Sequence, residues 1–174
     1  GYNLLVHEPI YKNGEMVVVS EAYYAEYHTE TRCCDSKGNS YTVSVFDGYR
    51  TTHGLISSFN LDGELLWSTT FAVNTLSYTL KERIRVLPAE EETVLAFNYG
   101  GYIYSKVIKG EKVLDVSSTK IETSFNSDKV KGNYEADMNY WYDNYYIAYG
   151  YQKIKKDKKK KSVNGEKGKR KVFY

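Results

Sequence analysis

The sequence predicts an all-β protein, and two features of its 174 residues carry that prediction. Tyr occurs 19 times and Pro twice, and Val, Thr, Ile and Phe are common, a composition that favours strands. No long run spaces its apolar residues at i, i+3, i+4 and i+7, as an amphipathic helix would. We therefore expect strands and almost no helix. No apolar run approaches the roughly 20 residues of a transmembrane segment.

The first strands are expected around a turn at Asn13-Gly14. Two short apolar patches precede this turn within residues 3–11. Asn-Gly is the most favourable pair for a two-residue hairpin loop. The wholly apolar stretch 16–19 then predicts a strand that begins in the core.

A long arm is expected to continue from that strand. Beyond residue 20, apolar and polar side chains alternate as far as Arg32, which is typical of a strand exposed on one face. Residues 35–40 are polar and predict the turn of the arm. Residues 41–46 then predict its returning strand.

The clearest hairpin spans residues 56–68. Asp62-Gly63 suits a two-residue type I′ turn because both central residues of that turn take positive φ. The large apolar side chains around it keep the two-residue period of a strand, so one face of the hairpin should be buried. These side chains are Phe59, Leu65 and Trp67.

The second part of the chain should contain a compact meander. Residues 93–98 and 102–108 are strand-like runs separated by a Gly-Gly pair, and another run follows the glycine at position 110. A further unit should begin near Met138, extend along 145–154 and return at the C-terminal end.

The chain is thus expected to form three units, 3–73, 80–117 and 135–174, each with an apolar inner strand and an aromatic-containing extension. Repeats of about 40 to 50 residues with four strands each are typical of β-propeller blades. A closed propeller generally has about four or more blades, so we expect closure against another protein chain or the rest of a longer polypeptide. The alternative fold is a single antiparallel β-sandwich.

Residues 59–68 read Phe-Asn-Leu-Asp-Gly-Glu-Leu-Leu-Trp-Ser. They resemble the outer-hairpin motif of propeller blades of the quinoprotein-like and related secreted bacterial types. Gly63 and Trp67 keep the Gly-to-Trp interval of that motif. The Tyr-rich composition with long charged arms is also similar to uncharacterised envelope proteins of Bacteroidota. These resemblances imply a propeller-like fold and an extracytoplasmic location, in the periplasm, at the outer-membrane surface or secreted. They imply no functional residue.

Charge is unevenly divided along the chain. The net charge is +2, but residues 153–171 hold 11 Lys or Arg against two acidic residues, a net of +9, which leaves −7 elsewhere. Such a Lys-rich arm could bind an anionic polymer such as nucleic acid, lipopolysaccharide or an acidic glycan. Alternatively, it is a solvated hairpin whose lysines protect a sheet edge. The central lysines are Lys158, Lys159, Lys160 and Lys161.

Residues suited to metal binding or nucleophilic catalysis are few. Cys33 and Cys34 lie near His28, and thiolates with imidazole suit zinc or copper. Adjacent cysteines, however, lack the spacing that lets a pair hold one ion, so we expect free or vicinally bridged thiols at a loop tip. The sequence contains no Gly-x-Ser-x-Gly and no Gly-rich phosphate loop. We expect no catalytic residue, no cofactor and no metal.

Carboxylates and aromatic residues gather near the start of the third unit. Glu135, Asp137 and Asp143 lie beside Tyr140 and Trp141, and sugar sites combine acids with aromatic platforms. The competing interpretation is the end of a Tyr- and Trp-rich strand followed by a turn. A carbohydrate-binding or carbohydrate-active domain is therefore one hypothesis, and it requires an exposed Trp141.

The leading hypothesis is a non-enzymatic protein-interaction or scaffold module of the bacterial cell envelope. It is favoured by the missing catalytic motifs and by the abundance of Tyr, a side chain enriched in contact surfaces. The expected contact residues are Tyr23, Tyr24, Tyr27 and Tyr49, with the Lys-rich segment. Phe59, Trp67, Phe97 and Trp141 are expected in the core.

Overall fold

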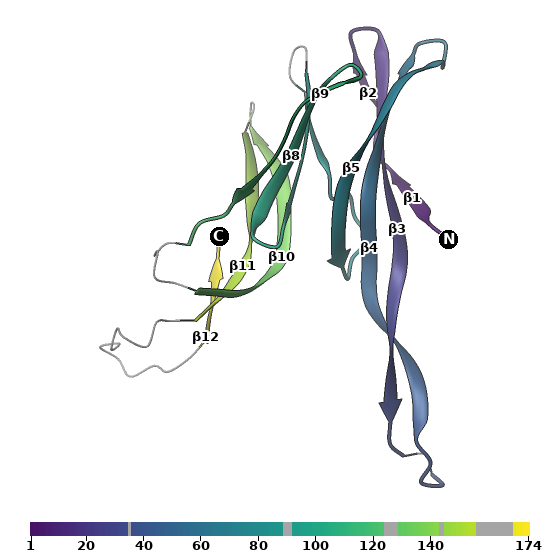
Figure 1. Ribbon diagram of the computed structural model, residues 1–174, viewed down its shortest axis with the longest axis vertical. Helices are drawn as coiled ribbons and strands as arrows, with labels where there is room; N and C mark the ends of the chain where they lie inside the picture. The colour runs from purple at the N-terminus through teal and green to yellow at the C-terminus, as the bar shows by residue number, and fades with distance from the viewer. Residues whose placement is uncertain (35, 89–91, 124–128, 143–144, 156–168) are drawn as a thin grey trace, which may run out of the picture. The chain divides into compact units, whose positions relative to one another are not determined.

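The computed structural model describes residues 1–34, 36–88, 92–123, 129–142, 145–155 and 169–174 (Figure 1). These residues form twelve strands and no helix, which confirms the all-β prediction. Accordingly, this part of the chain has no helix long and apolar enough to cross a membrane. The strands lie in three open antiparallel sheets. The chain divides into two compact units, Gly1–Glu82 and Arg83–Tyr174.

The first unit holds one sheet built around a long hairpin. β3 (Glu15–Arg32) and β4 (Tyr41–Asn60) form this hairpin, and β5 (Leu65–Ser77) pairs with the free edge of β4. β1 (Asn3–Val6) and β2 (Ile10–Lys12) both pair with the opposite edge of β3. The two short strands therefore follow one another along a single sheet edge.

Two tight turns have the geometry that their sequences predict. Asn13 and Gly14, between β2 and β3, have φ values of 52° and 78°. Gly100 and Gly101 in the second unit have φ values of 63° and 84°. Both pairs place two positive φ values at the centre of a two-residue hairpin loop, as a type I′ turn requires.

The prediction of a type I′ turn at Asp62-Gly63 is wrong. Gly63 has a φ of 85°, but Asp62 is not among the described residues with positive φ. The side chain of Asn60 is the reason, because its Oδ1 accepts hydrogen bonds from the backbone N–H groups of Asp62, at 3.1 Å, and Glu64, at 2.8 Å. This Asx-type turn ends β4 at Asn60 and gives a four-residue loop.

The core of the first unit lies on the central strands of its sheet. Val19 and Ile56 are register partners and are both fully buried. The expected burial of the hairpin around Asp62 holds only in part, since Phe59 and Trp67 are half-buried and Leu65 is exposed. β5 is an edge strand, so its first residues have a paired neighbour on one side alone.

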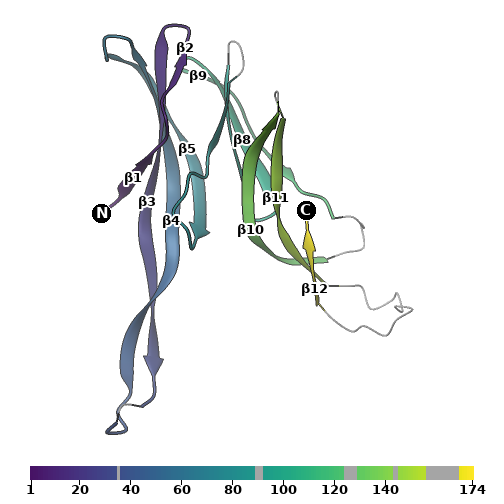
Figure 2. The same cartoon turned by 180° about the vertical axis from the view of Figure 1, so that it is seen from behind.

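β3 and β4 extend beyond their neighbours and form the predicted arm. β1 pairs with β3 no further than Tyr23, and β5 pairs with β4 no further than Tyr49. Beyond these residues the two strands pair with each other as far as Arg32 and Tyr41. Both views show this segment as a ribbon projecting from the sheet (Figure 1 and Figure 2). We call residues 25–48 the arm.

The second unit contains two sheets. The first is a four-stranded meander in sequence order, and the second has three strands. The meander consists of β6 (Arg85–Pro88), β7 (Thr93–Tyr99), β8 (Tyr102–Lys109) and β9 (Lys112–Lys120). The other sheet consists of β10 (Lys129–Tyr142), β11 (Tyr145–Lys155) and β12 (Lys169–Phe173).

β10 begins well before Met138, where the sequence led us to expect its start. The ladder between β10 and β11 shifts register between Val130 and Gly132 and again between Tyr134 and Asp137. Each such irregularity interrupts the two-residue alternation by which a strand is recognised in a sequence. The first part of β10 was therefore not visible as a strand.

Side chains of the meander donate hydrogen bonds to backbone carbonyls of the second sheet. Asn98, 3% exposed on β7, donates from Nδ2 to the carbonyl oxygens of Asp137, at 3.0 Å, and Tyr149, at 3.1 Å. Arg85 on β6 donates from Nε to the carbonyl oxygen of Met138 at 2.6 Å. Phe97, the neighbour of Asn98 in the chain, is buried as predicted.

Candidate contact surfaces

One face of the arm and its base carries a row of aromatic rings. Tyr27 and Phe46 are register partners whose ring centroids lie 5.4 Å apart. Phe46 also meets Tyr49 at 5.2 Å, and Tyr49 meets Tyr23 at 6.0 Å. These separations are those of favourable tilted and edge-to-face ring pairs. We call these four residues the aromatic row.

Exposure increases along the aromatic row towards the tip of the arm. Tyr23 and Tyr49, at the base, are half-buried, whereas Tyr27 is 58% exposed and Phe46 is 36% exposed. A pair of exposed aromatic side chains in register on a two-stranded ribbon has apolar area available for contact. Of the four predicted contact tyrosines on the arm and at its base, Tyr27 is therefore the best placed.

A bulge in β4 sorts the side chains of the arm onto its two faces. Glu26 pairs with Gly48 and Tyr27 pairs with Phe46, so Asp47 is an extra residue between them. An extra residue in one strand reverses the faces to which the following side chains point. The bulge therefore brings Phe46 to the face of Tyr27.

The other face of the arm carries ion pairs, which begin at its base. Arg50 forms a bidentate contact with Glu26, in which Nη2 lies 2.8 Å from Oε1 and Nε contacts Oε2. This guanidinium lowers the pKa of the Glu26 carboxyl. Tyr24 lies on this face as well and donates from its hydroxyl to Glu26 at 3.4 Å. The structure thus separates Tyr24 from the aromatic row.

Further along the same face, His28 lies between two carboxylates. Its Nε2 is 3.1 Å from Glu30 Oε1, and its Nδ1 is 2.6 Å from Asp47 Oδ1. Both ring nitrogens can donate at once only in the protonated imidazolium. The hydrogen bonds to Glu30 and then Asp47 raise the pKa of His28. Arg32 adds a second cation, with Nη2 3.2 Å from Glu30 Oε2.

Sequence reasoning missed this charged cluster. Its signal was nevertheless present, because Glu26, His28, Glu30 and Arg32 alternate at intervals of two and must share one face of a strand. The place of Asp47 in this cluster could not be predicted from the sequence, because it depends on the bulge. His28 therefore associates with carboxylates and not with the thiols considered above.

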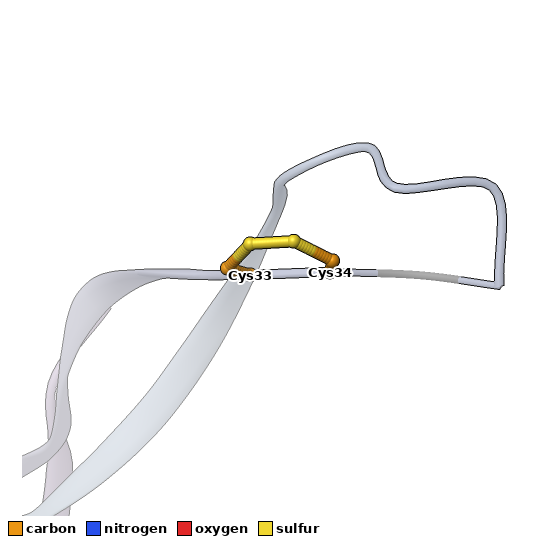
Figure 3. Close-up of a disulfide and its surroundings, with 2 residues drawn as sticks. All are labelled: Cys33 and Cys34. Carbon is orange, nitrogen blue, oxygen red and sulfur yellow. A yellow bond between two sulfur atoms is a disulfide. The ribbon is translucent and has the colours of Figure 1, made fainter.

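The tip of the arm carries a disulfide between Cys33 and Cys34 (Figure 3). Of the two thiol states left open by the sequence, the structure has the vicinally bridged one. Both cysteines are exposed. Within the described part of the chain, no three His, Cys, Asp or Glu side chains are placed to hold a metal ion.

A second group of aromatic side chains lies where β10 ends and β11 begins. Trp141 and Tyr142 have ring centroids 4.6 Å apart, and Tyr142 and Tyr145 lie 5.1 Å apart. Tyr140 is exposed beside them and meets Tyr146 at 5.5 Å. We call Tyr140, Trp141, Tyr142 and Tyr145 the aromatic end.

The expectation that Trp141 lies in the core is wrong, because its side chain is 61% exposed. β12 pairs with β11 only between Tyr151 and Lys155, so it does not reach the aromatic end. The sheet has two strands there, and its side chains gain little cover. Exposure of Trp141 is the condition that the carbohydrate hypothesis required.

Asp137 belongs to the packing of the second unit. It is 7% exposed, and its Oδ1 accepts from the backbone N–H of Met138 at 2.9 Å. Tyr149 donates from its hydroxyl to Oδ2 at 3.3 Å, and Arg85 Nη2 lies 3.6 Å from Oδ1. These three groups fix the position of the Asp137 carboxylate within its unit. Asp143 and the side chain of Glu135 lie outside the described residues.

The proposed basic surface lies outside the described residues. Lys158, Lys159, Lys160 and Lys161 all fall between β11 and β12 in residues 156–168. The anionic-polymer hypothesis therefore remains a prediction from the sequence.

The other two histidines contact side chains of the first unit. His7 and Glu21 are both buried, and His7 Nε2 lies 2.8 Å from Glu21 Oε1. His53 Nδ1 lies 2.9 Å from Thr52 Oγ1, its neighbour in the chain. The His7–Glu21 pair was not predicted, because it depends on the pairing of β1 with β3.

These surfaces are the available guide to function. Comparison of the chain with protein-family models, with curated proteins and with solved structures finds no match. The arm and the aromatic end are therefore the features of the molecule that bear on its function.

Proposed function

We propose that the chain is a non-enzymatic protein-interaction or scaffold module of the bacterial cell envelope, with the arm as its contact element. One observation carries this proposal: the arm leaves its sheet with an exposed aromatic pair on one face, Tyr27 and Phe46. The extracytoplasmic location rests on the similarity of composition and arms to Bacteroidota envelope proteins.

The arm suits a contact role because little supports it within its own unit. Beyond Tyr23 and Tyr49, the described strands of the arm pair with each other and with no third strand. Two-stranded ribbons are marginal on their own in water. A partner that covers one face would both bury apolar area and stabilise the ribbon.

The exposed area of the aromatic pair is large enough to contribute substantially to the free energy of binding a partner. Tyr27 is 58% exposed and Phe46 is 36% exposed. With about 200 Å² per aromatic side chain, about 190 Å² remains to be buried, which corresponds to about 5 kcal/mol at about 25 cal/mol per Å². This is a gross value, from which the costs of association are subtracted.

The test compares the two faces of the arm by photocrosslinking. A photoreactive phenylalanine analogue is placed at Tyr27 or Phe46, and in a control at Val45, whose register partner is His28 on the charged face. The full chain is irradiated in the cells that produce it. Adducts are then resolved by mass, and the crosslinked peptides are sequenced.

We expect one protein adduct of defined mass from both aromatic positions and at least tenfold less of it from Val45. The same partner peptide should be recovered from Tyr27 and Phe46. Equal adducts from the two faces, or none from the aromatic face, would count against the arm as a contact element.

For the architecture, we propose that the sheets are propeller-like blades. The meander β6–β9 supports this, because four antiparallel strands in sequence order are the topology of a blade. The alternative is a β-sandwich. A structure of the chain bound to its crosslinked partner would decide, since blades are arranged around a common axis and sandwich sheets face each other in two layers.

The aromatic end favours a second candidate function, carbohydrate binding without catalysis. Trp141 and its neighbours present exposed rings of the kind that stack on sugars, while Asp137 is held by packing contacts. In a Trp67→Phe background, Trp141 is the remaining Trp, so its fluorescence reports on this site.

Soluble neutral glycans, amino-sugar glycans and uronic acid polymers are each titrated into the Trp67→Phe chain. A saturable change in Trp141 emission that is lost in Tyr140→Ala would support the platform. Strong iodide quenching of Trp141 without any response to these glycans would leave an exposed Trp but remove this candidate function.

A further inference from the structure

The disulfide at the tip of the arm has no place in the stability of the fold. Disulfides stabilise proteins largely by closing a loop in the unfolded chain, and their effect grows with the length of that loop. Cys33 and Cys34 are adjacent residues, so their bond encloses no loop. It fastens no strand to another.

The same bond is accessible from the solvent. Every described residue from Thr31 to Thr42 is exposed, including both cysteines. The last pair of the ladder, Arg32 with Tyr41, precedes the tip, so opening the bond leaves all strand pairing intact. Exposed disulfides are the labile, regulatory or catalytic class, whereas structural ones resist reduction.

The chain offers these sulfurs no other partner. Cys33 and Cys34 are the only two cysteines among the 174 residues of the sequence. Within these 174 residues no third cysteine can reshuffle with them, so any exchange must involve a thiol from outside this sequence. Because no described side chain covers the tip, that thiol can belong to a small molecule or to a protein.

We propose that Cys33 and Cys34 form a thiol–disulfide exchange site that accepts electrons from dithiols. The assignment is independent of whether the arm also binds a protein through its aromatic row. It rests on the adjacency of the cysteines, their exposure at the tip and the absence of any third cysteine from the sequence.

The exchange proceeds in two steps. A thiolate of the dithiol attacks one sulfur of the Cys33–Cys34 bond, which breaks that bond, forms a mixed disulfide and releases the other cysteine as a thiolate. The second thiolate of the dithiol then attacks the other sulfur of the same dithiol molecule, which is the one in the mixed disulfide, and releases the second cysteine as a thiolate. The dithiol is oxidised to a disulfide, and the protein gains two electrons and, after protonation, two protons.

The test uses the full chain and dithiothreitol as the dithiol. The oxidised chain is equilibrated with mixtures of reduced and oxidised dithiothreitol, together with a reference protein whose disulfide is buried. The samples are quenched in acid, alkylated and weighed by mass spectrometry. We expect each chain to carry either two alkyl labels or none. The Cys33–Cys34 bond should open at a ratio of reduced to oxidised dithiothreitol about 100-fold lower than the ratio that opens the reference disulfide.

Single-cysteine variants test whether the pair acts together. Cys33→Ser and Cys34→Ser, incubated with oxidised glutathione, should each retain one glutathione per chain because no second cysteine can displace it. The reduced native chain should instead become oxidised and retain none. The melting temperature should be the same in the oxidised and reduced forms.

Three outcomes would overturn the proposal. The first is opening of the bond within tenfold of the reference ratio. The second is stable accumulation of glutathione on the native chain at the level of the variants. The third is a lower melting temperature for the reduced chain, which would return the bond to a structural role.

Discussion

Asn98 should be among the residues on which the second unit depends most. Its side chain is 3% exposed, and its Nδ2 group donates to two carbonyl oxygens of the neighbouring sheet, at 3.0 and 3.1 Å. Each hydrogen bond contributes about 1 kcal/mol net, and a buried acceptor left without its donor costs about 1 to 3 kcal/mol. We therefore expect Asn98→Ala to lower the free energy of unfolding by about 2 to 3 kcal/mol.

Urea unfolding followed by circular dichroism measures this loss. With a slope of about 2 kcal/mol per molar urea, the midpoint should fall by about 1 M, with the slope itself unchanged. Hydrogen exchange should quicken in β10 and β11, where the accepting carbonyls lie. Asn98→Asp keeps the shape of the side chain but replaces the two N–H donors by an acceptor facing two carbonyl oxygens, so its loss of stability should be at least as large as that of Asn98→Ala.

Asn139→Ala is the matched control. Asn139 is exposed, and its Nδ2 donates to the hydroxyl of Tyr149 at 3.1 Å. Exposed substitutions usually change stability by less than about 0.5 kcal/mol. If Asn98→Ala and Asn98→Asp both cost no more than this control, the two sheets are not held by the Asn98 amide and the reasoning fails.

Two further predictions concern the arm. Gly48→Ala should destabilise the chain by on the order of 1 to 3 kcal/mol, because Gly48 has a φ of 139° and an added Cβ would lie 2.7 Å from the backbone oxygen of Ser77. In the control Gly38→Ala, at a φ of 80° with no atom within 4 Å of the added Cβ, the loss measured in urea should be smaller; equal losses would refute the close approach. Because the pKa of His28 is raised, its contribution to stability is complete below pH 6.5 and is lost as pH rises through the pKa of the folded state. The pKa of Glu30 is lowered, mainly by His28, so its contribution to stability is complete above pH 4.5 and is lost as pH falls through the pKa of the folded state. NMR titration should place the pKa of His28 above 6.5 and closer to 6.5 in Glu30→Gln; a native value at or below 6.5 would contradict the cluster.

The all-β class, the arm and several turns could be predicted because they depend on short-range patterns. Asn13-Gly14 forms the turn that its residues favour. Asp62-Gly63 carries a similar signal but does not, because the Asn60 side chain competes for the same backbone N–H groups. Turn chemistry is thus predictable only when the flanking side chains are considered.

The candidate surfaces could be predicted less well because they depend on how strands pair. Trp141 is a large aromatic residue in a strand, which ordinarily indicates the core, but β12 ends before it can provide cover. Asn98 interrupts an apolar run, and a buried amide requires partners. The sequence could not identify those partners, because they lie on β10 and β11 and become neighbours only in the folded unit.

The bulge at Asp47 serves the two faces of the arm differently. Deleting Asp47 alone would close the bulge, and Phe46 would then follow Gly48 directly and still lie opposite Tyr27, whereas His28 would lose one of its two carboxylates. Adding or removing two residues in each strand beyond the bulge would lengthen or shorten the ribbon while every other side chain kept its face. The reach of the arm is therefore free to vary in steps of two residues per strand, and the bulge is a requirement of the charged face and not of the aromatic pair.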